Sequence, residues 1–204
     1  INRARVASEM GVVPAALVTL NQTHSADVLT LDAPPAGRPR ADAMVTRTPG
    51  LALGILTADC APVLFADPAA GVIGAAHAGW RGARDGVLEA TLDAMVALGA
   101  DRGRIAAVIG PTISQPAYEV GPDFAEAFLD DNPETGRFFV GGPRGRPHFD
   151  LPAYALWRLR AAGVGQAEWT RHCTYRDPER FYSYRRTTHA GEADFGRLIA
   201  VIRL

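Results

Sequence analysis

Short apolar runs separated by polar turns dominate the first half of the chain. Each run is rich in Val, Leu, Ile or Ala and is bounded by Gly, Pro or Asp, which is the pattern of short β-strands. The runs occupy residues 17–20, 28–31, 43–46, 51–56, 61–67 and 71–79. Because the last four are apolar almost throughout, we expect strands that are buried on both faces, although a buried helix can share this pattern.

The pattern changes to helical spacing in the middle of the chain. Apolar residues recur every three or four positions over 87–98, and Gly99 stands where a helix C-cap is expected. Two further helices are predicted at 122–131 and from about residue 151 to residue 163. Later strands are predicted at 105–110, 167–170, 181–184 and 198–204.

Strands and helices alternate along the chain without a linker-like break or an internal repeat, so we predict one domain over residues 1–204. Hydrophobic residues make up 48% of the sequence, which is ordinary for a globular protein and sufficient for a buried core. The expected fold class is α+β, a layered sandwich with a mixed β-sheet and flanking helices.

The basic residues are unusual because all 21 are Arg. A guanidinium binds oxyanions bidentately, which favours a phosphate or nucleic-acid ligand. The 22 acidic residues leave a net charge of −1, however, and a domain that binds duplex nucleic acid usually carries a basic excess. We therefore expect no nucleic-acid partner and interpret most of the Arg as compositional drift.

The sequence also bears on the compartment. No run of ~18 apolar residues is present, and the first ten residues, which predict a short helix exposing Arg3 and Arg5, lack the apolar core of a signal peptide. Two cysteines do not make a disulfide framework in a chain of 204 residues. We expect a cytoplasmic protein with no membrane contact, either a monomer or a weak homo-oligomer.

Three residues that can ligate a metal stand at the ends of predicted strands. His77 is followed by Ala-Gly-Trp-Arg-Gly where a helix begins, Cys60 closes another run, and His24 lies in a loop with Gln22 and Asp27 as possible partners. Together the three can form a zinc site with an open fourth position, which suits catalysis. Taken singly, each has an ordinary alternative as a strand-end His bonded to backbone, a small buried thiol or a polar loop residue.

Other polar residues accompany these candidates. Arg81 offers a fork-shaped oxyanion donor beside the predicted helix N-terminus, and Asp59 is a candidate to orient a ligand or relay a proton. The stretch 173–186, which includes Arg185, interleaves aromatic residues with Arg. It can stack a base and bind phosphate, or it can be a strand with alternating faces. The remaining histidines lie in predicted polar loops and receive no role: His148, His172 and His189.

Taken in order, the motifs of the chain resemble a known family. NQTHSADV, LTADCAPVLFAD, GVIGAAHAGWRG, GPTISQPAYEVG and CTYRDPERFYSYRR follow one another and precede GRLIAVIRL. They look like the YfiH family, also called the laccase-domain or polyphenol-oxidase-like family, whose members are described as purine nucleoside phosphorylases. The resemblance runs from about the first residue to the last, and the stretch from TADC to HAGWRG is its most specific part.

The resemblance implies that His24, Cys60 and His77 are catalytic zinc ligands. It also implies phosphorolysis of adenosine, inosine, guanosine and methylthioadenosine, with adenosine deamination as a side activity, and a sandwich related to cysteine-hydrolase-like folds. The substrates would be a nucleoside and phosphate. The chain departs from the family twice: it starts at the segment that usually follows a Gly-rich, Arg-containing N-terminal stretch, and Thr112 stands where the family usually has Cys.

Three other functions remain open from the sequence. A cysteine hydrolase or amidase acting on cell-wall precursors would use Cys60 as nucleophile and His77 as base. A copper-dependent polyphenol oxidase follows the family's older name, but such an enzyme needs many imidazoles and the chain has no H-x-H motif. A non-catalytic module would hold a nucleotide on the segment 173–186.

Overall fold

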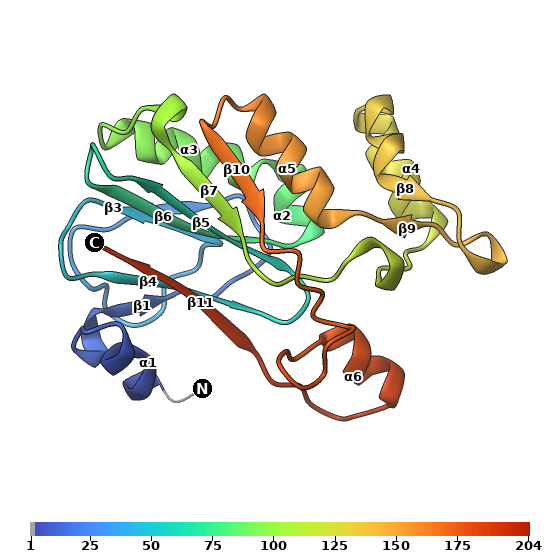
Figure 1. The fold of residues 1–204 in the computed structure, drawn as a ribbon, viewed down its shortest axis with the longest axis horizontal. Helices are drawn as coiled ribbons and strands as arrows, with labels where there is room; N and C mark the ends of the chain where they lie inside the picture. The colour runs from blue at the N-terminus through green and yellow to red at the C-terminus, as the bar shows by residue number, and fades with distance from the viewer. Residues whose placement is uncertain (1–2) are drawn as a thin grey trace.

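The computed structural model describes residues 3–204 and places two stacked sheets between helices (Figure 1). The helices are α1 (Arg3–Glu9), α2 (Trp80–Asp85), α3 (Val87–Ala97), α4 (Pro122–Asp131), α5 (Leu151–Ala161) and α6 (Tyr184–Ala190). The strands are β1 (Leu17–Thr19), β2 (Val28–Thr30), β3 (Ala43–Thr46), β4 (Ala52–Thr57), β5 (Ala61–Asp67), β6 (Val72–Ala78), β7 (Ala106–Ile109), β8 (Phe139–Val140), β9 (His148–Phe149), β10 (Gln166–Trp169) and β11 (Leu198–Arg203). Ile1 and Asn2, which belong to the predicted first helix, lie outside the described residues.

The larger sheet is mixed, with the strand order β10-β7-β5-β6-β3-β2. The outer pairs β2–β3 and β7–β10 are parallel, and the pairs between them are antiparallel. Helix α3 packs on β2, β3 and β6, and α5 packs on β7 and β10. Gly74 of β6 allows α3 to come close, because a Cβ there would lie 3.0 Å from Met95 Sδ. The main apolar core, which includes Val63 and Phe65, lies under these helices.

The smaller sheet, β1-β4-β11, packs on the other face of the larger one. A second apolar cluster fills the space between them, with Ile55 from β4 and Ile73 from β6 among its members. Helix α1 covers the outer side of the small sheet, where Ala7 packs near Leu17. Since the central strands are buried on both faces, their sequences are continuous apolar runs rather than alternating ones.

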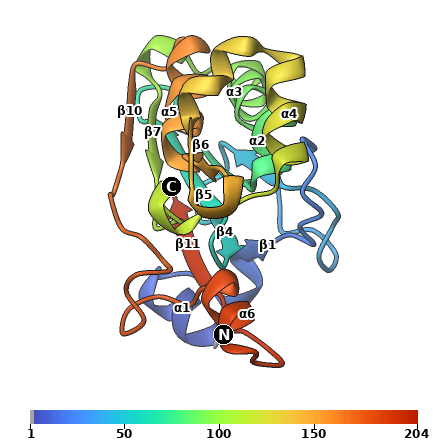
Figure 2. The same cartoon turned by 90° about the vertical axis from the view of Figure 1, so that its right-hand side faces the viewer.

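An aromatic cluster continuous with the main core builds the end of the molecule that carries α4 and the β8–β9 hairpin. Phe124 and Phe128 of α4 stack with 5.1 Å between ring centroids, and Phe149 of β9 lies 4.9 Å from the Phe128 ring. Figure 2 shows α4 and α3 at one end of the molecule and α6 and α1 at the opposite end. The cluster fixes the long connection between β7 and α5, which lines one side of the site described below.

The predicted α+β class with mixed sheets is confirmed, and most predicted strands and helices are present with small shifts at their ends. The relation to cysteine-hydrolase-like folds stays a prediction. His148 and His189 stand in β9 and α6 rather than in loops. Over residues 3–204 no helix is both long enough and apolar enough to cross a bilayer.

The strand predicted at 181–184 is wrong. Ser183 is the N-cap of α6, because its side chain accepts a hydrogen bond from the Arg186 amide at 3.1 Å. Tyr182 and Tyr184 are 56% and 53% exposed, and the buried Ser183 between them is bonded to the Asp59 carboxylate rather than to a neighbouring strand. The strand was predicted because the two tyrosine rings have apolar character, which is typical of strands.

Removing a core side chain should test this packing. Phe65 is fully buried beneath the helices, so we expect Phe65→Ala to lower the free energy of unfolding by about 3–5 kcal/mol, measured by urea denaturation. Val13→Ala is the control, because Val13 is 68% exposed and should change stability by less than about 0.5 kcal/mol. A loss as small for Phe65→Ala as for the control would contradict the core described here.

Candidate functional site

His77 enters the site from the central strand β6. Alternation along this strand turns Ile73, Ala75 and His77 toward the small sheet, and only 3% of His77 is exposed. Its Nδ1 lies 2.8 Å from Asp42 Oδ1, and its amide donates to the Asp42 carbonyl at 2.7 Å. Since Asp42 holds Nδ1, the other ring nitrogen, Nε2, is left to face the site.

Asp42 also holds the loop that carries His24. Its carboxylate has no exposed surface and accepts hydrogen bonds from the amides of Thr23, His24 and Ser25 at 2.7–2.9 Å. Burial alone would raise the pKa of Asp42, but the bonds from His77 and these amides outweigh it and hold the pKa well below its usual range. The loop is therefore wrapped around an ionised carboxylate, and His24 adopts a positive φ of 62°.

Cys60 comes from the tight turn between β4 and β5. Its Sγ lies 3.9 Å from His24 Nε2. Burial raises the pKa of the Cys60 thiol, but hydrogen bonding and charge from His24 and His77 outweigh burial. The net result is a pKa of about 7, below the usual value for a thiol. Burial lowers the pKa of His77, whereas its hydrogen bonds to Asp42 and Cys60 and their negative charges bring it up to about 9.

The three side chains fit a metal ion. Their ligand atoms lie within 4.8 Å of one another, and the His24 and His77 rings stand edge to face with 4.8 Å between centroids. Gly79 leaves room for them, because a Cβ there would lie 2.9 Å from His24 Cδ2 and 3.0 Å from Cys60 Sγ. Two imidazoles and a thiolate suit zinc or copper. Within residues 3–204 they form the single compact group of three or more His, Cys, Asp or Glu side chains able to hold a metal.

A cavity of about 270 Å³ opens beside this cluster. One side carries the candidate metal ligands His24 and Cys60, and aromatic or aliphatic side chains form most of the rest. The lining consists of His24, Ala58, Asp59, Cys60, Trp80, Ile113, Tyr118, Leu151, Tyr184 and Arg185. Burial and the nearby Cys60 raise the pKa of Tyr118, so its hydroxyl stays neutral at physiological pH. The cavity thus combines flat apolar walls with the positive charge of Arg185 and with two side chains, His24 and Cys60, that can bind a metal.

Arg185 supplies that cation. Its Nη1 donates to the Glu119 carbonyl at 2.7 Å, and its guanidinium lies 5.4 Å from the centre of the Tyr118 ring. The side chain is thus fixed against one wall of the cavity. Asp59 also lines the cavity, but both of its carboxylate oxygens accept hydrogen bonds from the C-terminal segment.

Other residues chosen from the sequence lie further from the cluster. Arg81 is exposed on the first turn of α2, with its guanidinium 5.1 Å from the Trp80 ring centre, and it is not among the cavity-lining residues. Gln22 is bonded to the backbone of Leu56 in β4 rather than to His24. Asp27 is exposed, and its carbonyl, not its carboxylate, is bonded to the start of β3.

Sequence reasoning missed Asp42, which is the carboxylate that orients His77. The sequence places Asp42 directly before the run 43–46, but its bond to His77 is a contact across the fold that this position does not reveal. Sequence reasoning also did not name Trp80 or Tyr118, which form walls of the cavity. Both lie inside motifs that were already noted, HAGWRG and GPTISQPAYEVG.

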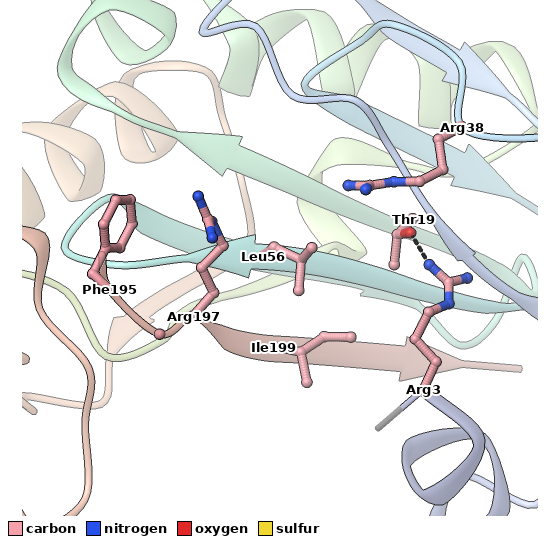
Figure 3. Close-up of a pocket in the computed structure, with 8 residues that line it drawn as sticks. Arg3, Thr19, Arg38, Leu56, Phe195, Arg197 and Ile199 are labelled. Carbon is pink, nitrogen blue, oxygen red and sulfur yellow. Dashed lines mark hydrogen bonds between the residues drawn. The ribbon is translucent and has the colours of Figure 1, made fainter. Parts of the chain in front are cut away.

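A second, larger cavity of about 380 Å³ lies on the small sheet and shares no lining residue with the first. Figure 3 shows Arg3, Arg38 and Arg197 around it, with Leu56 of β4 and Ile199 of β11 between them. It contains no His, Cys, Asp or Glu among its lining residues. It therefore lacks groups for metal binding or acid–base chemistry, and the smaller cavity is the candidate active site.

The fold and the site together define a class, that of mixed-sheet α+β proteins with a candidate His–Cys–His metal centre. The chain belongs to the family described as multi-copper polyphenol oxidoreductase laccase, which matches residues 1–204.

Its relatives carry a different functional name. The chain is 44% identical over 203 residues to a Deinococcus radiodurans protein named purine nucleoside phosphorylase, covering 100% of this chain and 76% of the relative. It is 40% identical over 192 residues to the Escherichia coli purine nucleoside phosphorylase YfiH, covering 93% of this chain and 76% of that protein. The resemblance to the YfiH family inferred from the motifs is thereby confirmed.

Solved structures agree with this assignment. A Bacillus licheniformis protein titled hypothetical protein YfiH has a TM-score of 0.89 at 28% identity, covering 100% of this chain and 79% of that chain. A Neisseria meningitidis protein has a TM-score of 0.88 at 39% identity with the same coverage of both chains. The arrangement of the two sheets is therefore a property of the family.

Replacing the buried carboxylate should test its role at the metal site. In Asp42→Asn the His77 ring loses its charged partner, and we expect zinc affinity to fall by roughly ten- to a hundredfold in a chelator competition assay. Asp27→Asn, an exposed change on the same loop, should leave zinc affinity unaltered. Unchanged zinc affinity in a folded Asp42→Asn protein would show that Asp42 does not orient a ligand.

Proposed function

We propose that this protein is a zinc-dependent purine nucleoside phosphorylase, which cleaves a purine nucleoside with phosphate to give the free base and ribose 1-phosphate. The observation that carries the proposal is the opening of the His24–Cys60–His77 cluster into a cavity that also contains aromatic walls and Arg185. The names of the Deinococcus and E. coli relatives support the same activity.

The metal would be held by His24, Cys60 and His77. Three protein ligands leave a position for an oxygen ligand, and a zinc ion there acts as a Lewis acid toward an oxyanion or water. Asp42 keeps His77 in the tautomer with hydrogen on Nδ1, so that Nε2 can bind the ion. Copper is the alternative ion, but a multi-copper enzyme requires further ligand clusters that residues 3–204 do not contain.

The cavity walls suit the two substrates. Trp80, Tyr118 and Tyr184 offer flat faces for a purine ring, and Arg185 offers a fixed positive charge for phosphate. In the reaction the bond between C1′ and the base nitrogen breaks, a phosphate oxygen bonds to C1′, and the base leaves with a proton. Charge builds on the sugar as C1′ acquires oxocarbenium character, so an anion held beside it stabilises the transition state.

The substrates we propose are adenosine, inosine, guanosine and methylthioadenosine, with deamination of adenosine as a side activity. All share a purine joined to a ribose or a 5′-substituted ribose, and the flat aromatic walls offer stacking faces that any purine can use. Arg81 and the first turn of α2 are proposed to share the phosphate charge, with Trp80 of that turn lining the cavity and the exposed Arg81 lying outside its lining.

A cysteine hydrolase or amidase is the second candidate. The observation in its favour is the short approach of Cys60 Sγ to His24 Nε2, 3.9 Å, together with a thiol pKa of about 7. Covalent labelling of Cys60 during turnover would support this alternative. One zinc per chain, with no covalent intermediate, would favour the phosphorylase.

The central experiment combines metal analysis with a phosphate-dependence test on adenosine and inosine. His77→Ala should lose bound zinc and phosphate-dependent release of base, whereas His172→Ala, which changes a His outside the cluster, should keep both. Turnover by a His77→Ala protein without bound metal would exclude the proposed mechanism.

The aromatic wall should govern nucleoside affinity. Tyr118→Leu removes a flat face, and we expect the KM for inosine to rise by roughly ten- to a hundredfold, the range for losing one base–aromatic stack. Tyr182→Leu alters an exposed ring outside the cavity and should leave this KM unchanged. Steady-state kinetics at saturating phosphate make the comparison, and equal KM values for the two variants would remove Tyr118 from the base site.

A further inference from the structure

One carboxylate links the Cys60 turn to the start of α6. Asp59 precedes Cys60 in the turn between β4 and β5, and it is only 8% exposed. Its φ of 85° lies in the left-handed region, where residues other than Gly are uncommon. Its carbonyl accepts hydrogen bonds from the Thr112 hydroxyl at 2.6 Å and the Ile113 amide at 2.9 Å, which hold the turn in this conformation.

The carboxylate of Asp59 is directed to the C-terminal segment rather than to the metal cluster. Oδ1 accepts from the Thr174 hydroxyl at 2.6 Å. Oδ2 accepts from the Ser183 hydroxyl at 2.9 Å and from the Arg185 amide at 2.6 Å. Both oxygens are therefore committed to groups of this segment, and a buried carboxylate with three donors is costly to move.

These bonds fix the backbone position from which the Arg185 side chain extends. The Arg185 amide is anchored on Asp59, and its Nη1 is anchored on the Glu119 carbonyl at 2.7 Å. The Arg185 residue is thus anchored at its backbone and at its guanidinium, and it lines the cavity. Asp59 is adjacent to Cys60 in the chain and is bonded to the Arg185 amide. It therefore connects Arg185 to the side of the cavity that carries Cys60.

We propose that Asp59 is a positioning residue that places Arg185 for phosphate binding and does not itself touch substrate. This inference rests on the proposed function for the identity of the anion. It assigns Asp59 neither substrate contact nor proton transfer. It also gives Thr174 and Ser183 a role, since they orient the carboxylate that holds the Arg185 backbone.

A double-mutant cycle on zinc-loaded protein tests the proposal, with affinity for inorganic phosphate measured by calorimetry. Asp59→Asn replaces one acceptor oxygen by an amide, and we expect phosphate to bind at least about tenfold more weakly, as Arg185→Ala should also do. If Asp59 acts through Arg185, adding Asp59→Asn to Arg185→Ala should cause no further loss. The KM for phosphate should follow the same pattern, with the KM for inosine within about twofold of the parent.

Controls separate positioning from general damage. The Asp177 carboxylate lies in the same segment and accepts hydrogen bonds from Arg180 rather than from Arg185. Asp177→Asn should therefore leave phosphate affinity unchanged. Hydrogen exchange at the Arg185 amide should quicken in Asp59→Asn but not in Asp177→Asn, and zinc content should stay constant in both.

Additive losses in the cycle, or loss of zinc from Asp59→Asn, would overturn the positioning role. An unchanged phosphate affinity in a folded Asp59→Asn protein would overturn it as well. Failure of the parent protein to phosphorolyse nucleosides, with the calorimetric cycle intact, would instead count against the proposed function alone.

Discussion

The site depends on one buried carboxylate, that of Asp42. A charge with no solvent exposure is tolerated only when hydrogen bonds replace its water. Here the donors are three successive amides, the hydroxyls of Thr23 and Ser25, and the His77 ring. The hydrogen bonds to the Asp42 carboxylate therefore hold the loop that carries His24 in a curled conformation. The same carboxylate fixes the tautomer of His77. The His24 backbone amide and the His77 ring come from distant parts of the chain, and both bond to this single carboxylate.

The sheet supplies the rest of the geometry. Asp42 directly precedes β3, β3 pairs with β6, and β6 pairs with β5 immediately after Cys60. The ends of neighbouring strands thus bring Asp42, Cys60 and His77 to one edge of the central sheet, although they are far apart in sequence. Gly79 then lets the start of α2 come close to the cluster. The family name emphasises several copper ions, whereas the described chain presents one three-ligand cluster beside a cavity with aromatic walls.

Part of this could be predicted from the sequence. Continuous apolar runs predicted the central strands because those strands are covered on both faces, and the placement of His24, Cys60 and His77 at strand ends predicted a common cluster. The interpretation of 181–184 as a strand failed because Ser183 caps a helix and the tyrosines there are exposed. The role of Asp42, and the orientation of Asp59 toward Thr174 and Ser183, arise from contacts across the fold that no local spacing encodes.

The central claim is that His24, Cys60 and His77 bind one metal ion with an open position for an oxygen ligand. X-ray absorption at the zinc edge of the metal-loaded protein measures this ligand set directly. The account predicts one sulfur at about 2.3 Å, two imidazole nitrogens at about 2.0–2.1 Å and one further light-atom ligand. A spectrum with no sulfur ligand, or with an all-oxygen shell, would contradict it.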